Sequence, residues 1–175
     1  MFTSRNSVGL DVGSQLIKLV GMRRQGDTGR VKVFGQIATP PGMVENGLIN
    51  NPEEAGKELG KLVEELKLKG SKVVSALSGQ QVYTRLMTLP AMRHDDLRTA
   101  ALYQATSFLP ISIDDVTADI CPVREFEGPE GRMAEIFFIA ARKTQAENLV
   151  KTCQIAGLTL TRLEIEPLAL KTLYY

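Results

Sequence analysis

Hydrophobic positions in the first forty residues alternate with polar ones in the manner of β-strands. Short apolar runs cover residues 8–12 and 16–22, and a strict period of two follows over residues 31–37. A Gly-Ser pair separates the first two runs, and residues 25–29 provide turn-forming chemistry between the second and third. The opening of the chain is therefore predicted to be an antiparallel three-stranded meander.

Helical spacing follows this meander. Asn51 can serve as an N-cap and Pro52 as the first helical residue, while Gly70 is the predicted stop. Lys67 and Lys69 would then occupy the last turn, where cations suit the negative helix end. The predicted buried face consists of Ala55, Leu59, Leu62, Val63 and Leu66. This amphipathic pattern predicts a helix that covers a sheet.

A second series of elements follows the apolar strand predicted over residues 72–77. Strands are predicted over residues 82–88, 118–126 and 133–142, and a helix over residues 94–109. The run from Glu135 to Ala141 is apolar enough to predict a central strand that is buried on both faces. These elements together predict a small α+β subdomain over residues 80–145.

The chain then returns to alternating helix and strand. Thr144 and Glu147 have the spacing of a capping box, and Gly157 ends the helix that they begin. Its predicted buried face consists of Ala146, Leu149, Val150 and Cys153. A strand over residues 158–165 and a helix from Pro167 complete an α/β body predicted over residues 1–79 and 146–175.

Composition and charge exclude several classes of protein. The chain has 175 residues, 43% of them hydrophobic, and a net charge of +1, which argues against disorder and against a nucleic-acid partner. No signal peptide and no apolar stretch of the ~20 residues needed to cross a bilayer is evident, so a cytoplasmic location is expected. Cys121 and Cys153 are predicted to be two buried free thiols.

The most informative short segment is the first predicted turn. Asp11 stands at a strand end just before Gly13 and Ser14, and glycine lets the backbone approach an anion closely. The Ser14 hydroxyl and the Lys18 ammonium could contact phosphate oxygens, while Asp11 could hold Mg²⁺ through water. The alternative is an ordinary hairpin with a polar turn and a solvated lysine. P-loop, dinucleotide and nucleophile-elbow motifs are absent from the sequence.

Five segments of the sequence carry a resemblance to a known protein family, in which they occur in the same order. They are Val8 to Lys18, Leu89-Pro90 with Met92, Phe108-Leu109-Pro110, Ile113 to Val116, and Ala156-Gly157-Leu158 leading to Glu164 to Leu170. In this order they resemble the PilM family of actin-like type IV pilus assembly proteins, which is similar to FtsA. The resemblance covers essentially the entire chain. It implies an actin-like ATPase (ribonuclease-H-like) α/β subdomain, interrupted by a small inserted α+β subdomain.

The resemblance also implies a site and its ligands. By this resemblance, the first phosphate-binding loop of the family corresponds to Asp11, Gly13, Ser14 and Gln15, with Lys18 nearby. The implied ligands are ATP and Mg²⁺. Glu166 falls where actin-like relatives carry a polar residue that orients water or metal near the γ-phosphate. Family members continue into a second half that helps to clamp the nucleotide. This chain by itself is therefore expected to bind ATP poorly and to show weak or no ATPase activity.

The implied role is that of a cytoplasmic adaptor peripheral to the inner membrane. Such a protein binds the cytoplasmic tail of a PilN-type membrane protein in a groove whose residues the sequence does not identify. Two alternatives stay open: an FtsA-like cell-division protein, and an ATPase whose turnover is itself the function. The chain is expected to be part of a longer protein. Self-association through apolar surface that the second half would cover is also expected.

Overall fold

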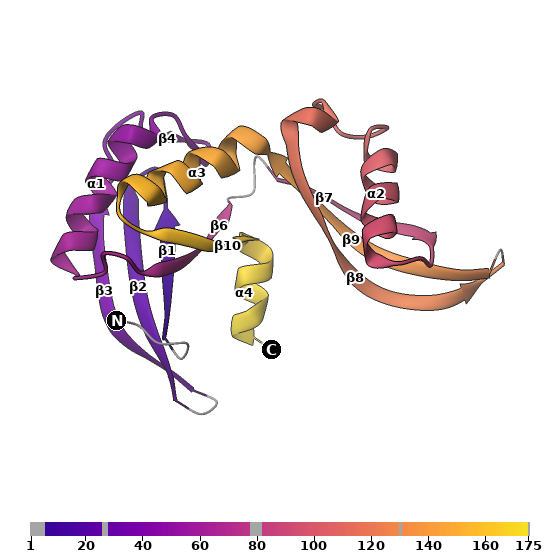
Figure 1. The fold of residues 1–175 in the computed structure, drawn as a ribbon, viewed down its shortest axis with the longest axis horizontal. Coiled ribbons are helices and arrows are strands. Elements are labelled where there is room, and N and C mark those ends of the chain that lie inside the picture. The colour runs from indigo at the N-terminus through magenta and orange to yellow at the C-terminus, as the bar shows by residue number, and fades with distance from the viewer. Residues whose placement is uncertain (1–5, 26–27, 78–81, 130, 175) are drawn as a thin grey trace. The chain divides into compact units, whose positions relative to one another are not determined.

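A computed structural model describes residues 6–25, 28–77, 82–129 and 131–174 (Figure 1). The chain divides into two compact units. The first comprises residues 1–81 and 145–175, and the second comprises residues 82–144. The second unit is thus an insertion within the sequence of the first.

A five-stranded mixed sheet forms the first unit. Its strands are β1 (Asn6–Val12), β2 (Leu16–Gln25), β3 (Thr28–Ala38), β6 (Lys72–Leu77) and β10 (Thr159–Ile165). They lie in the order β10-β6-β1-β2-β3, with β1 antiparallel to β2 and parallel to β6. The predicted antiparallel meander is confirmed, and its strands extend beyond the predicted ends.

Helix α1 (Pro52–Glu65) begins as predicted but ends earlier. The Asn51 side chain accepts a hydrogen bond from the backbone N–H of Glu54 at 3.1 Å. At the other end Lys67 takes a positive φ of 57°, and the N–H of Leu68 donates to the carbonyl of Val63. This is a Schellman cap with lysine in the left-handed position that glycine usually takes. The placement of Lys67 and Lys69 in the last turn was therefore wrong.

Helix α3 (Lys143–Ile155) starts one residue before the predicted capping box, so Thr144 lies inside the helix. Its buried side chains are Gln145, Leu149, Thr152 and Cys153. Val150, predicted to be buried, is exposed, and Ala146 is only half-buried. The buried stripe is rotated because two polar residues, Gln145 and Thr152, make hydrogen bonds inside the unit.

The sequence pattern does not predict the short hairpin that lies between the meander and α1. Strands β4 (Val44–Glu45) and β5 (Leu48–Ile49) pair antiparallel around Asn46 and Gly47. Both central residues have positive φ, 51° and 78°, as a type I′ turn requires. Strands of two residues are too short to show a period, so the Asn-Gly dipeptide was the only available signal.

The second unit is a three-stranded antiparallel sheet with one covering helix. Its elements are β7 (Val82–Pro90), α2 (His94–Ala105), the 3₁₀ helix η2 (Ile113–Asp115), β8 (Val116–Gly128) and β9 (Gly131–Arg142). The strand order β7-β9-β8 confirms that β9 is central. Burial along β9 alternates, with Phe138 fully buried and Phe137 half-buried, so burial on both faces was wrong. Only one face of this sheet packs on α2.

The end of α2 also differs from the prediction. The helix stops at Ala105, four residues before the predicted end at Leu109. The hydroxyl groups of Thr106 and Ser107 donate to the carbonyls of Tyr103 and Gln104, respectively. Such local side-chain hydrogen bonds compete with the continuing helix.

The two thiols lie in different environments, which corrects the prediction that both are buried. Cys153 is fully buried in α3, and burial raises the pKa of its thiol to about 12. Cys121 is exposed on β8, on the face of the sheet that points away from α2.

We expect Cys121 to react with a thiol reagent such as dithionitrobenzoate in the native protein, and Cys153 to react only in denaturant. Thiolate is the reactive form, and a buried thiol with a pKa of about 12 is almost entirely protonated near neutral pH. The release of thionitrobenzoate measures the number of accessible thiols. The variant Cys121→Ser should release none in the native state; release equal to that of the wild type would contradict the burial of Cys153.

Candidate functional site

A cavity of about 330 Å³ opens at one end of the five-stranded sheet, within the first unit. Its walls come from the β1–β2 turn, the end of β6, the β4–β5 hairpin, the first turns of α3 and the start of helix α4 (Glu166–Tyr174). The lining residues with polar side chains are Asp11, Ser14, Asn46, Ser75, Gln145 and Glu166. Segments from five distant parts of the chain thus converge on one space.

The β1–β2 turn is fixed by hydrogen bonds to its carbonyl groups. The N–H of Gly13 donates to the carbonyl of Leu16 at 3.0 Å. Thr39 donates from its hydroxyl to the carbonyl of Gly13 at 2.7 Å and from its N–H to the carbonyl of Gln15 at 2.9 Å. A Cβ on Gly13 would lie 3.0 Å from the Leu16 carbonyl, so the tight turn favours glycine. These hydrogen bonds hold the loop where it forms one wall of the cavity.

Two N–H groups of this turn stay unused. Among the described residues, the backbone N–H groups of Ser14 and Gln15 donate to no protein acceptor. Unused successive N–H groups in a turn are typical of anion-binding loops. The N–H of Gly13 is not free in the same way, because it already donates to the carbonyl of Leu16 within the turn. Anion binding here would therefore depend on the next two residues.

Asp11 and Lys18 form an ion pair across β1 and β2. The Lys18 ammonium lies 2.8 Å from the Asp11 carboxylate, and the two side chains are 42% and 56% exposed. Exposed pairs of this kind contribute only about 0–1 kcal/mol to stability. The pair can therefore exchange partners at little cost, which suits a carboxylate that receives a ligand.

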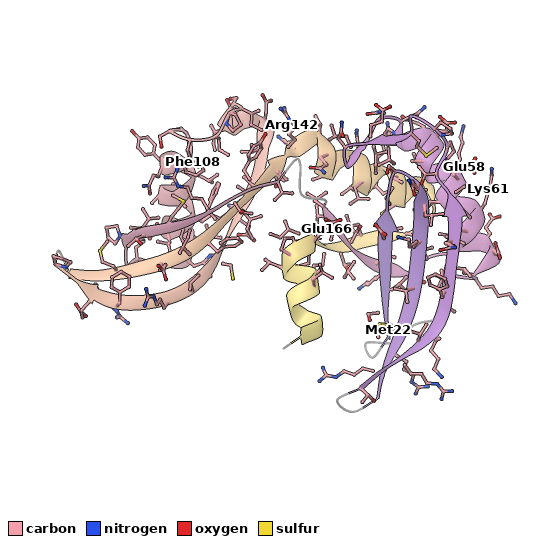
Figure 2. The ribbon with its side chains drawn as sticks, turned by 180° about the vertical axis from the view of Figure 1, so that it is seen from behind. Met22, Glu58, Lys61, Phe108, Arg142 and Glu166 are labelled. Carbon is pink, nitrogen blue, oxygen red and sulfur yellow. The ribbon has the colours of Figure 1, made fainter. Side chains whose placement is uncertain are left out.

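The structure brings four of the six predicted site residues to the cavity: Asp11, Gly13, Ser14 and Glu166. Glu166 is the first residue of α4 (Figure 2). Gln15 and Lys18 are not among the described residues that line the cavity. Lys18 reaches it only through its ion pair with Asp11.

Gln145 and the β4–β5 hairpin are the part of the cavity that the sequence did not indicate. The Gln145 side chain is 3% exposed and donates from Nε2 to the carbonyl of Gly47 at 3.1 Å. Asn148, one turn further along α3, donates from Nδ2 to the carbonyl of Ile49 at 2.8 Å. Two amides of α3 thus hold the hairpin in place.

The donor set of the cavity suits a hydrated cation better than a directly ligated one. Within the described parts of the chain, no group of three or more His, Cys, Asp and Glu side chains could hold a metal ion. Two carboxylates, on Asp11 and Glu166, line the cavity. Mg²⁺ typically keeps several waters and uses only one or two carboxylates. The residues present therefore fit a water-mediated Mg²⁺.

The sheet order, the covering helices and the unit inserted between β6 and α3 define the chain as an actin-like α/β protein with an inserted subdomain. The family model described as type IV pilus assembly protein PilM matches residues 9–174. The chain belongs to this family.

Two solved structures show how far the similarity extends. One, titled "PilM-PilN type IV pilus biogenesis complex", has 27% sequence identity and a TM-score of 0.82, and the match covers 93% of this chain and 48% of that one. The other is the cytoplasmic domain of EpsL, an inner membrane component of the type II secretion system of Vibrio cholerae. It has 13% identity and a TM-score of 0.61, covering 94% of this chain and 58% of that one. The chain thus spans about half the length of the PilM structure.

None of the helices in the described residue ranges combines the length and apolar character that a bilayer crossing requires.

Proposed function

We propose that this chain acts in an adaptor of type IV pilus assembly, and that it binds the cytoplasmic tail of a PilN-type inner-membrane protein. The fold that it shares with the PilM of a PilM–PilN complex, across 93% of its length, is the observation that carries this proposal. The adaptor would lie on the cytoplasmic side of the inner membrane, held there by its partner. An extended tail can bind through main-chain hydrogen bonds and side-chain pockets.

Calorimetry with a synthetic peptide tests this role. The peptide would cover the cytoplasmic tail of the PilN-type protein from the same organism, and a scrambled peptide of equal composition is the control. We expect saturable heat with the first peptide and none with the second. Absence of heat at high micromolar concentrations, with the chain shown to be folded by circular dichroism, would contradict the proposal.

The cavity of the first unit is proposed as the phosphate and metal end of an ATP site. Ser14 and Gln15 would bind phosphate oxygens through their free N–H groups, and Asp11 would hold Mg²⁺ through water. The metal would neutralise phosphate charge when bound. Glu166, across the same cavity, would hold water near the terminal phosphate. The chain covers 48% of the solved PilM, so nucleotide is expected to bind it weakly, with little or no hydrolysis.

The substitution Asp11→Asn is expected to abolish MgATP binding while leaving the fold intact. It removes the carboxylate that faces the metal, and it costs at most about 1 kcal/mol of stability because the Lys18 pair is exposed. Chemical-shift titration with MgATP at millimolar concentrations measures the binding.

Glu58→Gln is the matched control for this experiment. Glu58 also pairs with a lysine, Lys61, at 2.6 Å, but on α1 and outside the cavity lining (Figure 2). We expect this variant to bind MgATP as the wild type does. Equal binding by Asp11→Asn and the wild type would contradict the assignment of the cavity.

A further inference from the structure

Positive charge is concentrated where β2 ends and β3 begins. Residues 23–32 contain four basic side chains, Arg23, Arg24, Arg30 and Lys32, and one acidic side chain, Asp27. This segment therefore has a net charge of +3, whereas the entire chain has +1, so that all other residues together carry −2. The four basic side chains are exposed. The total charge of the protein is small, but its distribution is very uneven.

Three of these cations have no ion-pair partner in the part of the chain that the structure describes. They are Arg23, Arg30 and Lys32, while Arg24 has an interaction of its own within the chain. Arg23 and Arg30 also lie directly opposite each other across the two strands. Like charges in this position destabilise a strand pair. An anion bound from outside the chain would relieve this repulsion.

An exposed apolar side chain lies among the same charges. Val31, next to Arg30, is 55% exposed and is paired with Met22 (Figure 2). The methyl group of Met22 covers Gly29, since a Cβ on Gly29 would lie only 2.6 Å from Cε of Met22. Side chains alternate along a strand, so Val31 and Met22 share one face and Arg23 and Arg30 share the other. This end of the hairpin thus combines apolar surface with paired cations.

The charged end lies far from the nucleotide cavity. Strand β2 starts beside the β1–β2 turn and runs for 10 residues, which is roughly 30 Å at the usual rise of a strand. Its pairing with β1 ends at Arg23, so its last two residues pair with β3 alone. Figure 1 shows this end of β2 and β3 extending past β6 and β10. A ligand at this end is therefore independent of the cavity.

The combination of charge and apolar surface favours a membrane as the ligand. Clusters of four or more Lys and Arg bind anionic lipid headgroups, and each cation strengthens binding about fivefold. Apolar side chains beside them enter the boundary between headgroups and acyl chains. A nucleic acid would supply phosphates but would leave Val31 exposed, and the balanced total charge argues against such a partner.

We propose that the end of the β2–β3 hairpin is a lipid-binding surface, in which Arg23, Arg30 and Lys32 contact anionic headgroups and Val31 enters the interface between them. This goes beyond the proposed function, in which a partner protein alone holds the adaptor at the membrane. The hairpin gives the chain a second, direct contact with the same membrane. Two weak contacts on one surface strengthen each other, because the first raises the effective concentration of the second.

Vesicle flotation tests this proposal with the wild-type chain. The probe is a set of unilamellar vesicles of phosphatidylethanolamine and phosphatidylglycerol, and vesicles of phosphatidylcholine alone are the neutral control. We expect the chain to float with the anionic vesicles only. The bound fraction should fall as salt is added, because salt screens exposed charges. Absence of flotation with the anionic vesicles, or equal flotation with both kinds, would overturn the proposal.

Matched double variants locate the binding surface. Arg23→Gln combined with Arg30→Gln is expected to weaken vesicle binding about 25-fold, and it should not lower the Tm because it removes two opposed like charges. Lys57→Gln combined with Arg93→Gln removes the same charge from exposed positions on α1 and just before α2. This control should bind as the wild type does. Equal losses in the two double variants would overturn the proposal, because net charge and not the hairpin would then decide binding.

A single tryptophan reports on the apolar part of the surface. The chain contains no Trp, so Val31→Trp introduces a unique fluorophore. We expect its emission to shift to the blue with the anionic vesicles. Val123→Trp is the control, since Val123 lies on β8 and is 53% exposed, close to the exposure of Val31. Unchanged emission of Val31→Trp at saturating lipid, or an equal shift of Val123→Trp, would contradict insertion of the hairpin.

The outcomes separate this proposal from the proposed function. A chain that binds the PilN-type peptide but not the anionic vesicles contradicts the lipid-binding surface alone, and leaves a soluble acidic molecule as the partner of the hairpin. A chain that floats with the vesicles but gives no heat with the peptide supports the lipid-binding surface and contradicts the adaptor role.

Discussion

Replacing Phe138 with alanine is expected to unfold the second unit. This side chain is fully buried on β9, and it meets the ring of Phe108 edge to face with centroids 5.9 Å apart. Deleting a buried phenyl group costs about 3–5 kcal/mol through lost burial and the cavity left behind. A unit of 63 residues, Val82–Thr144, has little stability in reserve against such a loss.

Hydrogen exchange followed by mass spectrometry measures this effect region by region. In Phe138→Ala we expect peptides from β7, α2, β8 and β9 to lose protection, while peptides from β1, β2 and α1 keep theirs.

The adjacent residue supplies the control for this experiment. Phe137 lies on the same strand but on the open face of the sheet, where it is half-buried. Its replacement by alanine should cost roughly 1 kcal/mol. Equal loss of protection in both variants would contradict the one-sided core.

Local patterns predicted those elements whose signals lie within a few residues. The β1–β2–β3 meander follows from alternation, and the start of α1 follows from Asn51 and Pro52. The end of α1 did not follow, because Lys67 takes the left-handed position of the cap and glycine appears only at residue 70. Lysine is sterically strained in that position, and the residue after it, Leu68, is fully buried.

The sequence predicted where the strands lie better than it predicted which faces of the sheet are buried. The apolar run from Glu135 to Ala141 indicated a central strand, and its position in the sheet is confirmed. Whether its second face is covered depends on how many helices pack on the unit, and only α2 does so among the elements described. The same limit explains Cys121, which points to the uncovered face.

The sequence likewise indicated some residues of the candidate site and not others. Asp11, Gly13 and Ser14 lie close together in sequence, so a single predicted turn indicated all three. Their roles in binding remain a prediction. Gln145 reaches Gly47 across 98 residues of sequence. Nothing near a helical glutamine indicates such a partner, and the sequence placed Ala146 rather than Gln145 on the buried face. Contacts of long sequence separation become visible only when the chain is folded.

Two glycines of α1 are expected to respond in opposite directions to the same substitution. A Cβ on Gly56 would lie 2.6 Å from Cβ of Ile155 and 3.0 Å from the backbone oxygen of Thr152. These atoms belong to α3, so α1 and α3 pack at this point without room for a methyl group (Figure 1). Gly56→Ala should lower the free energy of unfolding by about 1–3 kcal/mol, because the helices must move apart.

Gly60, one turn further along α1, is the matched control. Its Cβ would meet only the Cα of Ala156 at 3.8 Å, an ordinary contact. Gly60→Ala should raise the free energy of unfolding by about 0.5–1 kcal/mol, because alanine loses less backbone entropy than glycine in a helix interior. Urea titrations followed by circular dichroism measure both changes. If both variants were stabilised, α1 and α3 could not approach as closely at Gly56 as the structure requires, and the wall of the cavity that α3 provides would have to be placed differently.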